Sequence, residues 1–468
     1  MEKFIAPITD FLWGPPMLAV FLCTGLWFTL RTKGFQIRRF SFWNKETFGS
    51  LFAGKAAKAG EKSITQWQAL TSALAACLGT GNIIGVATGI LLGGPGAVFW
   101  MWVSALLGTM TCAAENILGT KFRWKTADGN WMGGPMAYLS KGLGSNLLAC
   151  VYAVLLAVSA FGMGNMTQSN AIAEAARHSL RTSPFLSAAA VAVLVGMVIF
   201  GGVKRIGKVT EFLVPAMTGL FLLAGLWVIA AHWRAIPAVC GQILEGAFAL
   251  KAPAGAMAAY TMKQAVRVGV SRGVFSNEAG LGSSAVVHAA AETDEPATQG
   301  LWGIAEVFLD TIVMCTVTAF VLLCSGVWTP GAALGGVDFV VQAFESSLGV
   351  WGGRLVSLSI ALFAFATLTG WSFYGEQGVR FLFGEKGIKP YRVAYLLFAA
   401  LGCLLKLEAV WSLADVCNAL LAIPNLIGVL LLSGHAVRAL SVYETATGAK
   451  KACSVGGFSP APETRGKM

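Results

Sequence analysis

Long apolar runs separated by short polar or charged patches are the main pattern of the chain. A helix that crosses a bilayer needs about 20 predominantly apolar residues. We mark out eleven predicted spanning segments on this basis. They are Trp13–Leu30, Gln66–Gly93, Gly96–Leu118, Leu147–Ala171, Pro184–Gly201, Val209–Ala231, Ala258–Ala290, Gly300–Ser325, Arg354–Val379, Tyr391–Leu405 and Trp411–Val437. The pattern is typical of an all-α polytopic membrane protein.

Three stretches between and after these segments have a different character. Phe35–Phe52 and Ile236–Phe248 are short and amphipathic, so we predict that they lie on the membrane surface. The chain after Ser441 is polar, and we expect a mobile tail there.

Composition agrees with the pattern and adds an orientation. The 468 residues are 56% apolar and 12% charged, with a net charge of +11. With the N-terminus outside, the predicted cytoplasmic loops and tail hold 24 of the 34 Lys and Arg residues, and the outer loops and ends hold seven. Cytoplasmic loops of membrane proteins are rich in Lys and Arg. The positive charge therefore indicates this orientation in a plasma membrane, for a bacterium the inner one, rather than a nucleic-acid partner.

The residues that metal sites and enzymes need are scattered. The ten cysteines include no CxxC pair, and the four histidines lie far apart in the sequence. Cysteines that lie singly in apolar segments act as small hydrophobic residues. We find no metal cluster and no nucleophile–base pair, so we predict neither an enzyme nor an organic cofactor.

The second segment contains a stretch that does not suit a plain membrane helix, "AACLGTGNIIGVATG". Gly79, Gly81 and Gly85 weaken a helix, and Asn82 needs hydrogen-bond partners in hydrocarbon. The seventh segment is interrupted in the same way, in "RVGVSRGVFSNEAGLGSSAVV".

The two breaks lie five segments apart. Because five is an odd number, two sets of five helices would have opposite topologies and be related by an axis in the membrane plane. Polar, glycine-rich breaks at corresponding positions of two halves indicate a transporter site. Glycines that only let helices pack closely are the main alternative. A dinucleotide-binding loop is disfavoured because the context is helical and the glycine spacing differs.

Unwound backbone at membrane depth is tolerated where it lines a cavity. Its freed N–H groups and the positive end of a half-helix suit a carboxylate, and its freed carbonyls suit Na⁺ or an ammonium group. A channel would instead favour a repeated pore motif in a symmetric assembly.

The run "GGPGAVFWMWVSALLGTMTCAAE" from Gly93 to Glu115, together with "GTGNIIGVA" and "SNEAGLGSSAVVHAAAET", resembles the alanine or glycine:cation symporter family. The resemblance covers almost the whole chain. It implies a LeuT-type five-plus-five inverted repeat after one extra helix. The expected parts are 1–62 with the extra helix and a basic loop, repeats 63–232 and 233–440, and a cytoplasmic tail 441–468.

The family implies import of small neutral amino acids, alanine or glycine, driven by sodium and less often by protons. The alternatives are a proton-coupled transporter of a different neutral amino acid such as glutamine, or a channel or sensor on the same scaffold. The bilayer, the amino acid and sodium are the expected partners.

The resemblance also implies site residues. The expected sodium ligands are the carbonyls of Ala75, Leu78 and Ala366 and the hydroxyls of Thr369 or Thr367. The expected substrate pocket combines residues from both breaks: Gly79, Thr80, Gly81, Asn82, Ser276, Asn277 and Gly280. Trp371 is expected to wall the pocket, and Gln168 and Asn170 to reach it from the fourth segment.

Six ionisable residues lie in or near spans, where such groups must pair and are functional candidates. We expect Arg272 to belong to an external gate and Glu278 to orient the second break or bind a cation indirectly. Glu306 and Asp310 are expected to pair with cations such as Arg272. The other two are Glu376 and Asp415. Whether these residues form gates or structural pairs is left open.

Overall fold

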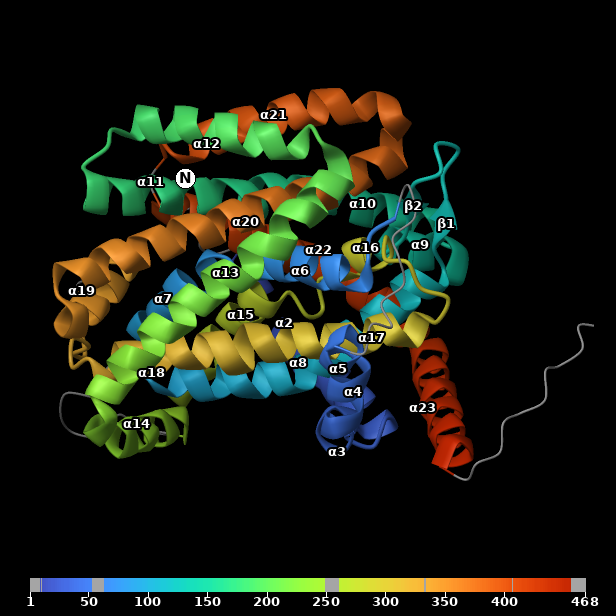
Figure 1. Ribbon diagram of the computed structural model, residues 1–468, viewed down its shortest axis with the longest axis horizontal. Helices are drawn as coiled ribbons and strands as arrows, with labels where there is room; N and C mark the ends of the chain where they lie inside the picture. Colours follow the sequence, from blue (N-terminus) through green and yellow to red (C-terminus); the bar gives the residue numbers. More distant parts are fainter. Residues whose placement is uncertain are drawn as a thin grey trace, which may run out of the picture.

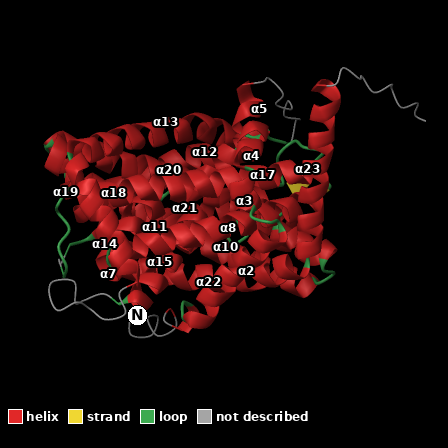
Figure 2. Ribbon diagram, turned by 90° about the horizontal axis from the view of Figure 1, so that it is seen from below, coloured by secondary structure: helices red, strands yellow, loops and turns green. Residues whose placement is uncertain are grey.

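The computed structural model describes residue 9 and residues 11–52, 63–248, 261–331, 334–405 and 407–455. Helices make up nearly all of this part of the chain, as Figure 2 shows. The first four helices are α2 (Pro15–Arg31), α3 (Phe35–Arg38), α4 (Phe40–Glu46) and α5 (Phe48–Phe52).

The predicted first repeat begins with a broken helix. Its elements are α6 (Gln66–Cys77), η1 (Gly81–Gly85), α7 (Val86–Gly93), α8 (Gly96–Lys121), the short hairpin β1 (Trp124–Lys125) and β2 (Trp131–Met132), α9 (Pro135–Ala137), η2 (Tyr138–Gly142), α10 (Asn146–Phe161), η3 (Gly162–Met166), α11 (Thr167–Leu180), α12 (Pro184–Ile199) and α13 (Gly202–Ala231).

The predicted second repeat follows a short helix, α14 (Ile236–Phe248). Its elements are η4 (Trp233–Ala235), α14 (Ile236–Phe248), α15 (Met262–Asn277), α16 (Ser284–His288), α17 (Pro296–Val307), η5 (Phe308–Cys315), α18 (Thr316–Cys324), α19 (Gly336–Leu348), α20 (Val350–Phe383), η6 (Gly384–Gly387), α21 (Ile388–Gly402), α22 (Leu407–Leu431) and α23 (Ser433–Val455).

Within the described residues, each predicted span coincides with a helix or a run of helices; residues 258–260 of the seventh span lie outside them. By length and composition, six helices of the described chain could cross a membrane, or seven if the bent pair α6–α7 is one span. This number falls below eleven partly because continuous helix from Val350 to Gly402 counts once, and α2 and α12 are shorter apolar helices. The number eleven therefore stays a prediction.

The broken helices lie inside the bundle (Figure 1). Helix α8 packs against α15 and α17, and α20 packs against α10, α11 and α6. The chain entering α6 and the chain leaving α16 are joined directly: Ile64 N–H donates to the Ala290 carbonyl at 3.2 Å, and Glu292 N–H donates to the Ile64 carbonyl at 2.8 Å.

Two surface features differ from the sequence predictions. The region after Ser441, expected to be a mobile tail, continues helix α23 to Val455. Helix α19 was not predicted, and its apolar face is buried against α20. The two amphipathic stretches form the short helices α3–α5 and the helix α14, as Figure 1 shows.

Candidate functional site

The first break lies at residues 78–80, where α6 and the η1–α7 helix meet with a bend of 50°. Gly79 has to be small because a Cβ there would collide with the Thr367 hydroxyl of α20. A Cβ on Gly81 would lie 3.2 Å from Cα of Ser276. The glycines thus bring the first break against α20 and against the second break.

Asn82 stabilises this bend from within. Its Oδ1 accepts a hydrogen bond of 3.1 Å from the Gly79 N–H. Its Nδ2 donates to Oδ1 of Asp310 at 2.6 Å and to the Asp310 carbonyl at 3.1 Å. The amide oxygen therefore stabilises the bend, and the amide nitrogen joins the break to η5.

The second break runs from Glu278 to Ser283, between α15 and α16. Glu278 (φ 57°), Gly280 (φ 94°) and Gly282 (φ 73°) all have left-handed backbone conformations. Only glycine adopts such angles at little cost, so Glu278 needs other interactions to hold it there.

Asp310 connects the two breaks. Besides Asn82, its carboxylate accepts hydrogen bonds from Ser276 Oγ at 2.9 Å and Thr311 Oγ1 at 2.7 Å. Asn277 Nδ2 in turn donates to Thr311 Oγ1 at 3.1 Å. We expected Asp310 to pair with a cation such as Arg272. That expectation is wrong, because every hydrogen bond described for this buried carboxylate comes from a neutral group.

Gln168 reaches the first break from α11. Its Oε1 accepts a hydrogen bond of 3.2 Å from the Thr80 N–H. The buried Thr80 hydroxyl finds no partner within the described part of the chain. A buried polar atom without a partner is uncommon and indicates a place for a ligand or water. Asn170 points elsewhere and donates to the carbonyls of Gly402 and Leu405.

Two of the candidate sodium ligands, Ala75 and Thr367, meet where α6 passes α20. Thr367 Oγ1 donates to the Ala75 carbonyl across the two helices at 2.9 Å. Thr369 Oγ1 donates to the Ala366 carbonyl of its own helix at 2.7 Å. A hydroxyl whose hydrogen is directed at a carbonyl keeps its lone pairs for a cation. The inter-helix bond favours Thr367, the alternate choice from the sequence, over Thr369.

Trp371 and Glu278 form a second link between α20 and the breaks. The indole Nε1 donates to Glu278 Oε1 at 2.7 Å, and Ser283 Oγ donates to Oε2 at 2.5 Å. A Cβ on Gly164 of η3 would overlap the Trp371 ring. Glu278 is thus held by hydrogen bonds in its strained conformation, and Trp371 packs between η3 and the second break.

Arg272 pairs with Asp415 of α22 in a bidentate ion pair of 2.8 and 3.2 Å. These residues line a cavity of about 430 Å³ together with Lys263, Arg267 and Trp13, at the predicted outer end of α15. A second cavity of about 270 Å³ opens at predicted cytoplasmic loops and contains Glu376, which pairs with Arg380 and Arg392. Neither lining includes a residue of the two breaks.

Glu306 belongs to a separate buried cluster that the sequence did not reveal. It accepts from Ser284 Oγ at 2.6 Å, and its Oε2 lies 3.2 Å from Nε2 of His288. His288 Nδ1 lies 2.8 Å from Gln299 Oε1. The basic side chain beside Glu306 is thus a histidine rather than an arginine.

Asn425 and Glu115 were also missed as neighbours of the second break. Asn425 Nδ2 donates to the Gly280 carbonyl at 2.8 Å and to Glu115 Oε1 at 2.5 Å. Tyr138 donates its hydroxyl hydrogen to Asn425 Oδ1, and Tyr152 donates to the Leu281 carbonyl at 2.8 Å. Only their isolated positions in apolar runs of the sequence could have indicated that these polar residues have a special role.

On the predicted cytoplasmic side, Arg123 holds the chain that leaves α16. Its guanidinium donates to the carbonyls of Ala289, Ala291 and Thr293 at 2.6–2.7 Å and lies 3.9 Å from the Trp131 ring centre. Burial lowers the pKa of Arg123 from its usual value.

The chain is similar to known transporters over most of its length. A family model described as the sodium:alanine symporter family matches residues 1–455. The sodium/alanine symporter AgcS of Methanococcus maripaludis is 42% identical over 93% of this chain and 95% of its own. The probable sodium/glutamine symporter GlnT of Bacillus subtilis is 36% identical over 95% of this chain and 91% of its own.

Solved structures resemble the fold at low identity. MhsT in complex with L-phenylalanine superposes with a TM-score of 0.58 at 13% identity, covering 82% of this chain and 93% of MhsT. A manganese transporter of Eremococcus coleocola gives 0.55 at 13% identity over 85% of this chain and 88% of its own. The fold is therefore the LeuT-type transporter fold, as the sequence predicted.

Proposed function

Because the chain belongs to the sodium:alanine symporter family, we propose that it imports alanine and glycine together with sodium ions by alternating access. One observation carries the proposal: both broken helices are hydrogen-bonded to one buried carboxylate, Asp310. A site shared by two broken helices changes shape when either half moves, which is what alternating access requires.

The substrate carboxylate binds at the first break. In the structure the Thr80 N–H donates to Gln168 Oε1, so this amide oxygen lies where a substrate carboxylate oxygen would accept. The carboxylate replaces it and also accepts from the buried Thr80 hydroxyl, which has no other partner in the described chain. The ammonium group faces Asp310 and the carbonyls freed at the breaks. Gly79 and Gly81 leave room for a small ligand.

Sodium binds between α6 and α20. Its ligands are the carbonyls of Ala75, Leu78 and Ala366 with the Thr367 or Thr369 hydroxyl. Hard oxygen ligands suit an alkali cation. Trp371 forms the wall that limits the substrate side chain, and its bond to Glu278 couples that wall to the second break.

The repeats span 63–232 and 233–440, after an extra helix in 1–62, and 441–468 forms a cytoplasmic tail. The similar order of elements supports them: each half has a broken helix first, and each has at least one short helix between its second and third long helices. The N-terminus lies outside, the C-terminus lies in the cytoplasm, and the protein resides in a plasma membrane, supported by the Lys and Arg distribution.

Radiolabelled alanine uptake into proteoliposomes tests the function. An inward sodium gradient should drive accumulation, and a sodium ionophore should abolish it. A proton gradient without sodium should drive little uptake. Uptake driven by protons alone, or absence of alanine uptake by folded protein, would contradict the proposal. Competition by glycine and glutamine separates the proposed substrates from glutamine, the alternative that the similarity to GlnT supports.

A further inference from the structure

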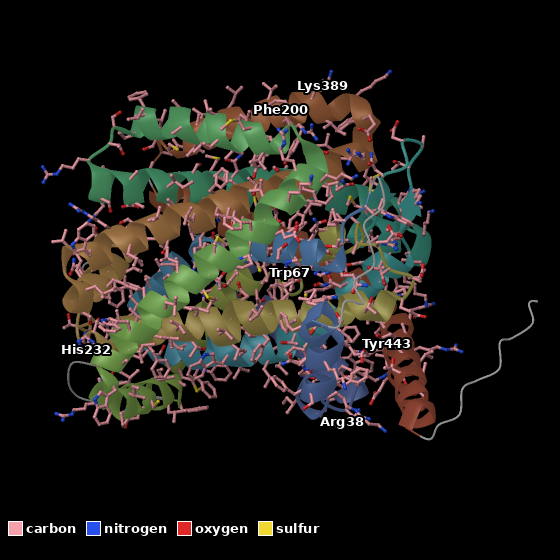
Figure 3. All side chains as sticks on the ribbon, viewed as in Figure 1. Arg38, Trp67, Phe200, His232, Lys389 and Tyr443 are labelled. Carbon is pink, nitrogen blue, oxygen red and sulfur yellow. The ribbon has the colours of Figure 1, made fainter. Side chains whose placement is uncertain are left out.

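A basic cavity of about 450 Å³ lies between the end of α2, helix α3 and helix α23, away from both breaks. Arg31, Lys33, Arg38 and Arg39 line it, and Glu444 is the only carboxylate among the lining residues. Figure 3 labels Arg38 on the α3 side and Tyr443 on the facing helix α23. Nothing in the proposed transport site uses these residues.

A tight turn brings the four basic residues together. Lys33 (φ 55°) and Gly34 (φ 65°) are both left-handed, and the Gly34 N–H donates to the Thr29 carbonyl at 2.7 Å. This arrangement ends α2 and sends the chain straight into α3. Arg31 and Lys33 before the turn therefore line the same cavity as Arg38 and Arg39 after it.

The charges at this cavity do not balance. Arg39 pairs with Glu444 at 2.5 Å, and Arg38 lies 3.8 Å from the same carboxylate. Four cationic side chains thus share one carboxylate in the lining. Arg38 and Arg39 keep 46% and 45% of their side-chain surface exposed. An anion that enters the cavity would be attracted by the remaining charges and could accept bidentate hydrogen bonds from arginine.

Exposed apolar side chains are the sequence neighbours of three of the basic ones. Leu30, Ile37 and Phe40 are 67%, 63% and 44% exposed, next in sequence to Arg31, Arg38 and Arg39. An amphipathic segment that follows a spanning helix lies at the headgroup level of a bilayer, with apolar side chains among the acyl chains. Basic pockets at the cytoplasmic end of spanning helices suit anionic lipid headgroups.

We propose that this cavity binds the phosphate group of an anionic phospholipid from the cytoplasmic leaflet. Arg31, Lys33 and Arg38 hold the phosphate, Arg39 stays paired with Glu444, and the acyl chains lie along Leu30, Ile37 and Phe40. Helix α23 forms the opposite wall and is fixed to α4 by the 3.2 Å hydrogen bond from Tyr443 to Glu46. The site is independent of the amino acid that the protein transports.

The test variant is Arg31→Gln/Arg38→Gln, which leaves the Arg39–Glu444 pair in place. Arg31 lies 5.2 Å from the Trp27 ring centre. Arg234→Gln/Arg354→Gln is a matched control because it removes the same charge from two exposed arginines that lie 5.6 and 4.9 Å from the Trp233 and Trp351 ring centres. Arg31→Lys/Arg38→Lys keeps the charge and guards against a folding defect.

Purified full-length protein in detergent is titrated with short-chain phosphatidylglycerol, and binding is followed by native mass spectrometry at low salt. One arginine near an anionic lipid contributes about 1 kcal/mol, or about fivefold in affinity. We expect binding to weaken about 25-fold in the glutamine variant, hardly at all in the control, and by less than fivefold in the lysine variant.

Phosphatidylcholine and glycerol phosphate provide the comparison ligands. Equal binding of phosphatidylcholine, or equal binding of phosphatidylglycerol by the glutamine variant and the parent, would overturn the proposal. Competition by glycerol phosphate at the same concentration as the lipid would overturn the lipid as the occupant and assign the cavity to soluble phosphate compounds.

Discussion

Asn82 and Asp310, 228 positions apart in the chain, are joined by a 2.6 Å hydrogen bond from the amide Nδ2 to the carboxylate Oδ1. The same amide closes the first break through Gly79, and the same carboxylate accepts from Ser276 of α15. The geometry of one break therefore depends on the other through two side chains.

Asn82→Ala should reduce alanine uptake at least about tenfold, because a hydrogen bond to a buried charged group is worth about 1.5–3 kcal/mol. The measurement is uptake per inserted protein in proteoliposomes. Asn170→Ala is the control, since it also removes a buried amide that donates two hydrogen bonds, but to carbonyls away from the breaks. Equal effects of the two variants would mean that Asn82 is important only for packing.

Asp310→Asn keeps the size of the side chain and removes its charge. If the carboxylate faces the substrate ammonium group, the substrate concentration for half-maximal uptake should rise at least about tenfold, as expected for loss of a charged hydrogen bond. Thermal stability should change little, because the amide oxygen still accepts from Asn82. A variant with unchanged substrate dependence would exclude this contact.

Thr367→Ala and Thr369→Ala test the sodium ligands. Loss of one oxygen ligand should shift the sodium activation curve of alanine uptake upward by about tenfold, and serine at the same position should shift it less. We expect the larger shift at Thr367, whose hydroxyl crosses from α20 to Ala75. A shift confined to Thr369 would assign the site to the other hydroxyl, and no shift at either would remove both.

Trp371→Leu should open the pocket to larger neutral amino acids and weaken alanine uptake, as a competition profile with leucine and glutamine would reveal. Trp371→Phe separates two roles of the side chain. Phenylalanine keeps an aromatic wall but cannot donate to Glu278. We expect Phe to lower the uptake rate with little change in selectivity. An unchanged profile for Leu would exclude Trp371 from the pocket.

Arg272 and Asp415 allow a gate to be distinguished from a structural pair. If the pair gates the outer cavity, Asp415→Asn should change the uptake rate while the melting temperature stays within a few degrees. A structural pair should lower the melting temperature instead, and the exchanged double variant Arg272→Asp/Asp415→Arg should restore it. The pair is only 12% and 11% exposed, so either effect should be measurable.

The breaks themselves could be predicted from sequence, because clustered glycines weaken a helix and an asparagine in an apolar run needs hydrogen-bond partners. Its position in the fourth segment made Gln168 a candidate for the pocket, and the structure hydrogen-bonds it to the Thr80 N–H. The hydrogen-bond partners of Asp310 and Asn425 could not be predicted, because the direction of a side chain on a membrane helix depends on how the helices pack. Helix α19 was missed because its apolar face is shorter than a span.

The sequence alone also could not decide between Thr367 and Thr369 as the sodium ligand. Both threonines lie on α20, two residues apart, and the motif could slip by one position. Two residues on a helix differ by about 200° in direction, so only the position of α6 decides which hydroxyl reaches it. That position depends on the close contact at Gly79 and on the neighbouring packing.

The backbone bridge between Ile64 and the chain around Ala291 acts as a mechanical coupling. It fastens the segment entering the first broken helix to the segment leaving the second, and Arg123 clamps the latter to the end of α8. In the proposed orientation these segments belong to the cytoplasmic halves of the two broken helices, and we expect the two halves to move together. Movement of either half would then displace the other, so we expect the amino acid and sodium to be released in one conformational step rather than in two independent ones.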